Sequence, residues 1–302
     1  MVAPMTENTR GALLMMAAMA AFTINDSIMK LLAGEMALFQ AIFLRGLVTT
    51  AVFVVLAWRF GVLRLPPAGR DRRLVILRSL AEIGAAGCFL TALFNMPLAN
   101  ATAILQSMPL AVTLAGAVFL REPVGARRWS AIAIGFLGVL LIVRPGAEGF
   151  TVYSMLALAS VGFVTLRDIV TRQMSSALPS LTVALAASAG VTVAFGLASV
   201  TGPWVVPTPG MLAKLTGAGV FVIAGYLLSV LVMRRGEIGF IAPFRYTSLL
   251  WALALGWLVF GDWPDTLTLL GAGVVVATGS FTLWRGARKH APAARARPDR
   301  LG

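Results

Sequence analysis

The chain has 302 residues, of which 59% are hydrophobic and 12% are charged, and its formal net charge is +13. Soluble domains carry about 25% charged residues, so this composition excludes a soluble globule and predicts an all-α integral membrane protein that crosses the bilayer many times. Cys88 and His290 are the only residues of their kinds, and His290 lies in a polar tail, so we expect no intrachain disulfide, no metal site and no cofactor.

Ten apolar runs follow one another along the chain, each near the length of about 20 residues that a membrane helix needs. They cover residues 11–33, 36–57, 74–95, 98–120, 127–144, 151–172, 179–200, 211–233, 238–260 and 266–284. Short turns rich in proline, glycine and charge separate them. The sequence therefore predicts ten transmembrane helices.

The basic residues lie almost entirely on one side of this arrangement. Of the 25 Lys and Arg residues, 18 fall in the loops and tails of one side, only Arg144 falls on the other, and six lie within the runs. Cytoplasmic loops are the ones that carry excess Lys and Arg. We therefore expect both termini in the cytoplasm and a multi-pass protein of the inner membrane. The positive charge sets topology in this interpretation, so the expected partner is the lipid bilayer and not nucleic acid.

Two segments about half a chain apart share one pattern. Residues 23–30 (T-I-N-D-S-I-M-K) and 165–172 (T-L-R-D-I-V-T-R) align, and Asp26 and Asp168 are 142 residues apart. Two halves of five helices each would insert in opposite orientations, because five is odd. This is the inverted-repeat design of many secondary transporters. We expect a first repeat at 1–146, a second at 147–286, and a disordered basic cytoplasmic tail at 287–302.

The end of the first half carries motifs that resemble a known family. Residues 120–123 (L-R-E-P) precede the helix 128–139 (R-W-S-A-I-A-I-G-F-L-G-V), and 143–146 (V-R-P-G) close it. Residues 97–104 (P-L-A-N-A-T-A-I) are of the same kind. The chain resembles the drug/metabolite transporter superfamily, and within it the bacterial proteins with two EamA-type repeats, including amino-acid exporters. The resemblance implies ten helices, a central cavity, and export or exchange of small metabolites.

Asp26 is the first charged residue inside an apolar run. An acid in a bilayer is costly and needs a partner. Arg45 lies at a similar depth in the second run and could pair with it across a helix contact, whereas Lys30 offers a pair one turn away on the same helix. Such a pair either orients two helices or takes part in substrate or proton binding.

Two further charged groups lie nearer the expected cytoplasmic side. Asp168 is expected to face Arg167 or Arg172. Arg78 and Glu82 are one turn apart and form either a salt bridge closed on itself or a gate. A gate would need a partner from the other half.

Prolines interrupt the fourth and ninth runs, which correspond in the repeat, at Pro109 and Pro243. Interrupted helices in matching positions are the best sequence indication of a transporter binding site. Polar and aromatic residues gather around them, and Arg245 could hold a substrate carboxylate. The predicted substrate-binding residues are Asn100, Gln106, Ser107, Arg245, Tyr246 and Trp251. The alternative is that their side chains bond to their own helix backbone.

These features predict a secondary transporter that moves a small metabolite by alternating access. Aromatic or neutral amino acids are the leading substrate class, and multidrug or nucleoside-like cationic metabolites are the alternative. A membrane-embedded enzyme is disfavoured, because one His and one Cys leave little from which to build a catalytic site. The sequence leaves the oligomeric state open and is compatible with a monomer.

Overall fold

The computed structural model of the protein describes residues 6–64, 69–119, 121, 125–144, 151–175, 177–232 and 238–290. All regular elements in these ranges are helical. They are α1 (Glu7–Leu31), α2 (Leu38–Arg59), α3 (Arg70–Asn95), α4 (Leu98–Leu105), α5 (Met108–Phe119), α6 (Ala126–Val143), α7 (Val152–Arg172), α8 (Ser180–Ser199), α9 (Pro209–Val232), α10 (Ile238–Ile241), the 3-10 helix η1 (Ala242–Tyr246), α11 (Thr247–Phe260) and α12 (Thr266–His290).

Nine segments of the described residues are helical, long and apolar enough to cross a membrane, with α4 and α5 counted together as Leu98–Phe119. The tenth predicted run, 238–260, is helical but divided into α10, η1 and α11. With 14 residues, α11 alone is about 21 Å long, which is shorter than the hydrocarbon core of about 30 Å. Ten crossings therefore stay a prediction, which requires 238–260 to cross as one broken helix.

Both helix interruptions lie beside the prolines that the sequence singles out. Pro109 is the second residue of α5, and Gln106 and Ser107 form the turn that separates α5 from α4. Pro243 lies in the 3-10 turn between α10 and α11. Proline lacks the backbone N–H that would continue the α-helical ladder, so the chain tightens or turns at these points.

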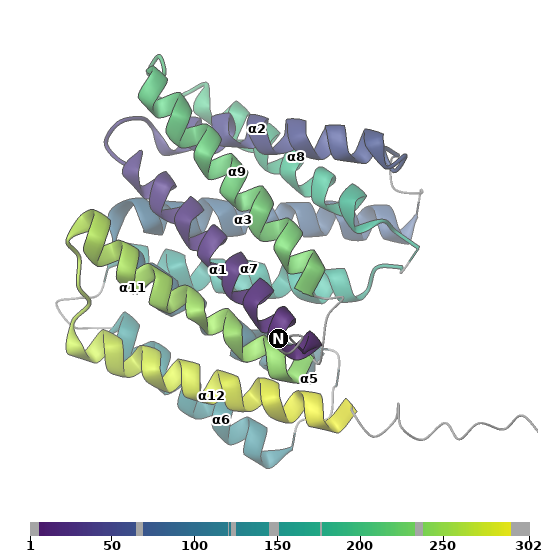
Figure 1. The fold of residues 1–302 in the computed structure, drawn as a ribbon, viewed down its shortest axis with the longest axis vertical. Coiled ribbons are helices and arrows are strands. Elements are labelled where there is room, and N and C mark those ends of the chain that lie inside the picture. The colour runs from purple at the N-terminus through teal and green to yellow at the C-terminus, as the bar shows by residue number, and fades with distance from the viewer. Residues whose placement is uncertain are drawn as a thin grey trace, which may run out of the picture.

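The strongest helix contacts all join the first half of the chain to the second. The pairs are α1 with α9, α3 with α7, α2 with α8 and α6 with α12. If the halves are exchanged, the first two pairs interconvert and the last two map onto themselves. Figure 1 shows α2 and α8 at one end of the long axis, and α6 and α12 at the other. The packing therefore has the internal two-fold pairing that a duplicated chain of ten helices would show.

The core is divided into two apolar clusters, and each draws on both halves. One cluster includes Met29, Leu93 and Leu215, and the other includes Ile104 and Val275. Among the described residues, neither half of the chain therefore buries its apolar surface by itself.

The basic tail expected at 287–302 is only partly described. The last helix, α12, continues to His290, so the helix reaches four residues into that segment. Residues 291–302 lie outside the described residues, and their disorder stays a prediction.

The α6–α12 pair depends on close backbone approach. A Cβ added at Gly138 would lie 2.9 Å from the carbonyl oxygen of Gly271, and a Cβ added at Gly271 would lie 2.6 Å from that of Gly138. Backbone atoms cannot move aside as a side-chain end can. By contrast, a Cβ added at Gly273 on the same helix would meet nothing within 4 Å.

We therefore expect Gly271→Ala to destabilise the protein by about 1–3 kcal/mol, the usual cost of overpacking. Gly273→Ala is the matched control and should leave the midpoint of thermal unfolding in detergent nearly unchanged. Equal midpoints for the two variants would contradict this account of the helix pair.

An ion pair joins the halves at the end opposite the termini. Arg144 follows α6 and binds Asp265, whose carboxylate also accepts the Thr268 N–H at 2.9 Å and so caps the start of α12. Partial burial raises the pKa of Asp265, but the hydrogen bonds from Thr268 and Arg144 outweigh it and hold that pKa below its ordinary value. The charged form is therefore the form that the fold stabilises.

A group with a lowered pKa stabilises the fold above its ordinary pKa, and that contribution is lost as the pH falls through the lowered value. The stability difference between the natural protein and Asp265→Asn should therefore shrink as the pH falls from about 6 toward 3. The difference should stay below about 1 kcal/mol, because 52% of the Asp265 side chain is exposed. Thermal unfolding in detergent across this pH range measures the stability difference. Arg144→Gln should show the same reduced dependence of stability on pH.

Candidate functional site

A partly open cavity of about 240 Å³ lies between the two halves of the chain. It is lined by α1, α2 and α3 from the first half and by α7, α8 and α9 from the second. The lining residues are Phe22, Arg45, Gly46, Thr49, Phe53, Arg78, Glu82, Ala86, Arg167, Ala184, Ala187, Ser188, Val191, Val222 and Tyr226.

The cavity extends from about the middle of the bundle toward the end where α3 and α8 begin and α2, α7 and α9 end. The loops at that end carry the excess of Lys and Arg. If the predicted topology holds, the cavity therefore lies on the cytoplasmic side of the bilayer centre.

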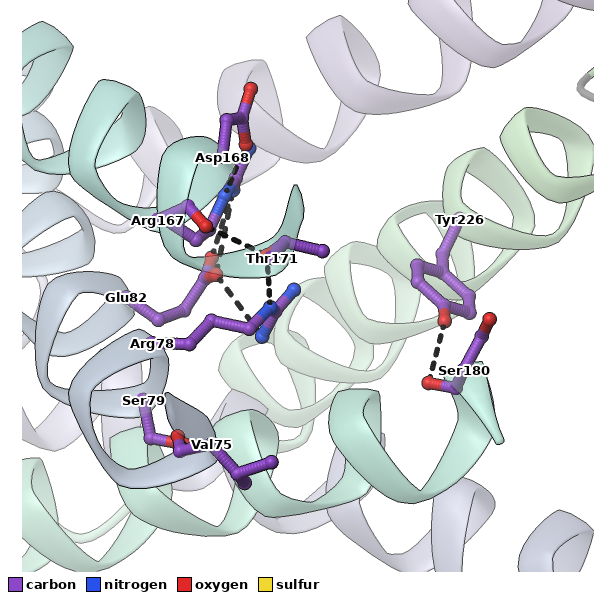
Figure 2. Close-up of polar contacts among 9 residues, drawn as sticks. All are labelled: Val75, Arg78, Ser79, Glu82, Arg167, Asp168, Thr171, Ser180 and Tyr226. Atoms are coloured by element: carbon purple, nitrogen blue, oxygen red, sulfur yellow. Dashed lines mark hydrogen bonds and ion pairs between the residues drawn. The ribbon is translucent and has the colours of Figure 1, made fainter. Parts of the chain in front are cut away.

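An ionic network crosses from α3 to α7 along the cavity wall. Both carboxylate oxygens of Glu82 lie 3.4 Å from Nη1 of Arg167, and Arg167 also binds Asp168 at 2.9 Å. Arg78 donates through Nε to the Thr171 hydroxyl at 3.2 Å. Figure 2 shows the side chains of Arg78 and Glu82 pointing toward Arg167 and Thr171. This network contains the inter-half partner that a gate at Arg78 and Glu82 requires, and it places Asp168 against Arg167.

Two arginines that line the cavity each keep a buried nitrogen without a hydrogen-bond partner among the described residues. They are Nη1 of Arg78 and Nε of Arg45. Nη1 of Arg78 lies 3.8 Å from Glu82, which is within ion-pair range but too far for a hydrogen bond. Buried polar groups are normally satisfied, so unpaired donors on arginines that line a cavity indicate a place where an acceptor on a ligand could bind.

Asp26 and Arg45 are linked through a residue that the sequence reasoning missed. Arg45 Nη1 donates to Asn25 Oδ1 at 3.1 Å, and Asn25 Nδ2 donates to Asp26 Oδ1 at 2.8 Å. Within the described ranges no direct ion pair joins Asp26 to Arg45 or to Lys30. Lys30 instead donates to the carbonyl oxygens at the end of α3, of which that of Met96 is 2.7 Å away. Asp26 lies outside the cavity lining.

A seam of hydroxyl groups joins α2 to α8 beside the cavity. The hydroxyls of Thr50 and Ser188 are 2.8 Å apart, those of Thr50 and Thr192 are 2.9 Å apart, and Thr49 also reaches Ser188 at 3.3 Å. The sequence signal for this seam is the Ser and Thr content of the run 179–200, which shows the polar residues but not their partners in α2.

The polar cluster at the interrupted helices lies elsewhere, and none of its predicted residues lines the cavity. The buried Gln106 side chain donates to the Tyr246 carbonyl at 3.2 Å, and Ser107 bonds to the Ile104 carbonyl of its own helix. The bond between Gln106 and Tyr246 joins the two helix interruptions. Trp251 lies on an outer face, with 42% of its surface exposed.

Two polar groups near the interrupted helices are buried without a hydrogen-bond partner among the described residues. Tyr246 is buried, and its hydroxyl has no partner in the described part of the chain. The same holds for the side-chain oxygen of Asn100. The Arg245 guanidinium lies 4.0 Å from the Met108 sulfur through Nη2. A substrate role for these residues stays a prediction.

Contacts between the halves close the end of the bundle opposite the cavity. Gln40 of α2 is fully buried, donates to the Val205 carbonyl at 2.5 Å and accepts the Val205 N–H at 3.1 Å. Lys214 of α9 forms an ion pair with Glu35, which follows α1. The arrangement is therefore asymmetric, with a cavity on one side of the centre and specific cross-half contacts on the other.

The described residues contain no group of three His, Cys, Asp or Glu side chains placed as they would be around a metal ion. The side chains that line the cavity supply arginine, carboxylate, hydroxyl and aromatic groups.

A sequence profile described as the EamA-like transporter family matches two stretches of this chain, 9–144 and 151–284. The two matches correspond to the two halves that the helix packing relates. A solved crystal structure shares the fold, with a TM-score of 0.64 at 16% identity over 93% of this chain and 98% of that one.

Relatives with assigned functions are similar over most of their length. The riboflavin transporter of Vibrio cholerae is 28% identical over 68% of this chain and 69% of its own. The S-adenosylmethionine uptake transporter of Rickettsia conorii is 28% identical over 86% of this chain and 87% of its own. The pseudopaline exporter of Pseudomonas aeruginosa is 24% identical over 91% of this chain and 96% of its own.

The network between α3 and α7 can be tested by a double-mutant cycle. Because Glu82 and Arg167 are 3.4 Å apart and each less than a third exposed, Glu82→Gln and Arg167→Gln should be coupled by about 1 kcal/mol in unfolding free energy. The control cycle pairs Glu82→Gln with Arg73→Gln, on an exposed part of α3, and should show no coupling. Additive effects at Glu82 and Arg167 would contradict the ion pair.

Proposed function

The chain belongs to the EamA-like transporter family of small-molecule transporters and is a multi-pass protein of the inner membrane, and we propose that its substrate carries a carboxylate bound in the central cavity. The family and the relatives indicate transport and not catalysis. Secondary transport by alternating access of the two halves is part of the same proposal, since the chain has no Walker-type phosphate-binding loop and would draw on gradients.

The observation that carries this proposal is the pair of unsatisfied arginine nitrogens in the cavity lining. Arg45 and Arg78 present buried N–H groups without acceptors, and guanidinium groups bind carboxylates strongly through charge-assisted hydrogen bonds. Glu82 is the only acid among the described lining residues, and its carboxylate could bind a substrate ammonium group. A zwitterion would satisfy both charges at once.

The remaining lining suits an apolar or aromatic substituent. Phe22, Phe53 and Tyr226 line the cavity, and the rings of Phe53 and Tyr226 pack edge to face with centroids 5.3 Å apart. Aromatic or neutral amino acids and their derivatives therefore remain the substrate class that we propose. The named relatives differ in substrate, so this class rests on the cavity lining. An amino-acid headgroup, such as the one in S-adenosylmethionine, would match the charges described above.

The two ends of the bundle suggest how access alternates. In the described arrangement the cavity lies toward the expected cytoplasmic side, while the Gln40–Val205 and Glu35–Lys214 contacts close the other. The opposite state requires these contacts to separate and the cavity to close on the expected cytoplasmic side, where the α3–α7 network already joins the halves. Because the halves are inverted, similar motions of each can exchange the two states.

The test is uptake into proteoliposomes that contain the purified protein, with a panel of amino acids, nucleosides and organic cations, each measured with and without a pH gradient. Transport of zwitterions supports the proposal. Transport of cations without a carboxylate, and of nothing else, would overturn it. The pH gradient separates proton-coupled transport from facilitated diffusion.

Within that assay, Arg45→Gln and Arg78→Gln should each raise the half-saturating concentration of a carboxylate substrate by about 10-fold or more, because a hydrogen bond to a charged group is lost. Arg59→Gln, at the exposed end of α2, is the control and should transport normally. Arg245→Gln separates the two candidate sites. If it abolishes transport while the cavity variants remain active, the substrate binds at the interrupted helices.

A further inference from the structure

A second hollow lies where α6 begins and α12 approaches its end. Its volume is about 280 Å³, and its lining residues are Gly125, Ala126, Arg127, Arg128 and Arg285. Three of these five residues are arginines, and none of the described lining residues is an acid. Arg127 and Arg128 are far from Arg285 in sequence and belong to the other half of the chain. The packing of α6 against α12 brings them together.

The hollow has several unused donors for an anion. Gly125 precedes α6 without a side-chain cap, and the first turn of this 18-residue helix holds no acid, so no residue of that turn offsets the positive end of the helix at the hollow. Nε of Arg128 is buried and has no hydrogen-bond partner in the described part of the chain. Within the described ranges no ion pair involves Arg127, Arg128 or Arg285. A helix start beside a cluster of arginines is an arrangement suited to a phosphate group.

The surroundings of the hollow are those of a membrane interface. Trp129 and Trp284 are 44% and 43% exposed beside it, as expected for aromatic residues at headgroup level. From there the outer face of α6 is apolar, with Ile134, Leu137 and Leu141 between 40% and 60% exposed. A phosphate with attached acyl chains would fill the basic hollow and cover this face, whereas a free phosphate would use only the hollow.

We propose that this hollow binds the phosphate group of an anionic glycerophospholipid from the leaflet on the arginine-rich side. That side is the predicted cytoplasmic one, and basic pockets between helices there are suited to anionic headgroups. The site is independent of the substrate cavity, because α6 and α12 contribute no residue to that cavity. A bound lipid would lie across the contact between the two halves and hold their ends together.

The experiment uses the full chain in a neutral detergent, with dissociation constants for phosphatidylglycerol and phosphatidylcholine measured by native mass spectrometry. Phosphatidylglycerol should bind at least about tenfold more tightly, and Arg127→Gln/Arg128→Gln/Arg285→Gln should lose that preference, since each charge-assisted bond is worth on the order of tenfold. The charge-matched control, Arg59→Gln/Arg64→Gln/Arg73→Gln, alters exposed arginines at the same end and should retain it.

Arg285→Gln alone changes one half-buried residue near the end of α12. This single variant tests the proposal even if the triple variant misfolds. It should weaken phosphatidylglycerol binding about tenfold, and Arg285→Lys should recover part of the loss. Equal losses in the site and control triples, or no preference for phosphatidylglycerol, would overturn the proposal. Binding of inorganic phosphate as tightly as phosphatidylglycerol would also overturn it, because the hollow would then be a site for a free anion. Substrate transport tests the cavity separately.

Discussion

Charged side chains inside apolar helices must face one another or water, because hydrocarbon does not solvate them, and this constraint determines where the two halves of the protein meet. Arg45, Arg78 and Glu82 come from the first half, and Arg167 from the second. All four converge on one cavity. The helices that carry them are those that pair across the halves. The polar interior and the packing of the duplicated halves are thus two aspects of the same arrangement.

The cavity and the closed end of the bundle differ in how completely their buried polar groups are hydrogen-bonded. At the closed end, the buried Gln40 amide is matched in both directions to the backbone of Val205, which leaves neither group for a ligand. In the cavity, by contrast, Arg45 and Arg78 keep unsatisfied nitrogens. A transporter needs buried polar groups that are fully hydrogen-bonded where it is closed and groups that lack partners where it binds substrate. The described arrangement has both.

The tertiary structure shows a further role for the helix interruptions. Gln106 and Tyr246 join the two breaks by a hydrogen bond, so these turns also serve as a contact between the halves. A proline-broken helix can build a binding site or a joint, and the sequence alone does not distinguish these uses. The unpaired oxygens of Asn100 and Tyr246 keep the first possibility open to experiment.

The sequence by itself determined the class of protein, the apolar helices and the duplication, because hydropathy, loop charge and the spacing of Asp26 and Asp168 are properties of the chain read in order. It also indicated Arg78 and Glu82, since residues one turn apart on a helix are neighbours whatever the fold. Only the tertiary structure decided that Arg167 completes this pair, that Asn25 links Asp26 to Arg45, and that Arg128 and Arg285 share a hollow. These contacts join helices from distant parts of the chain, and their geometry depends on which helix faces pack together, which local sequence patterns do not specify.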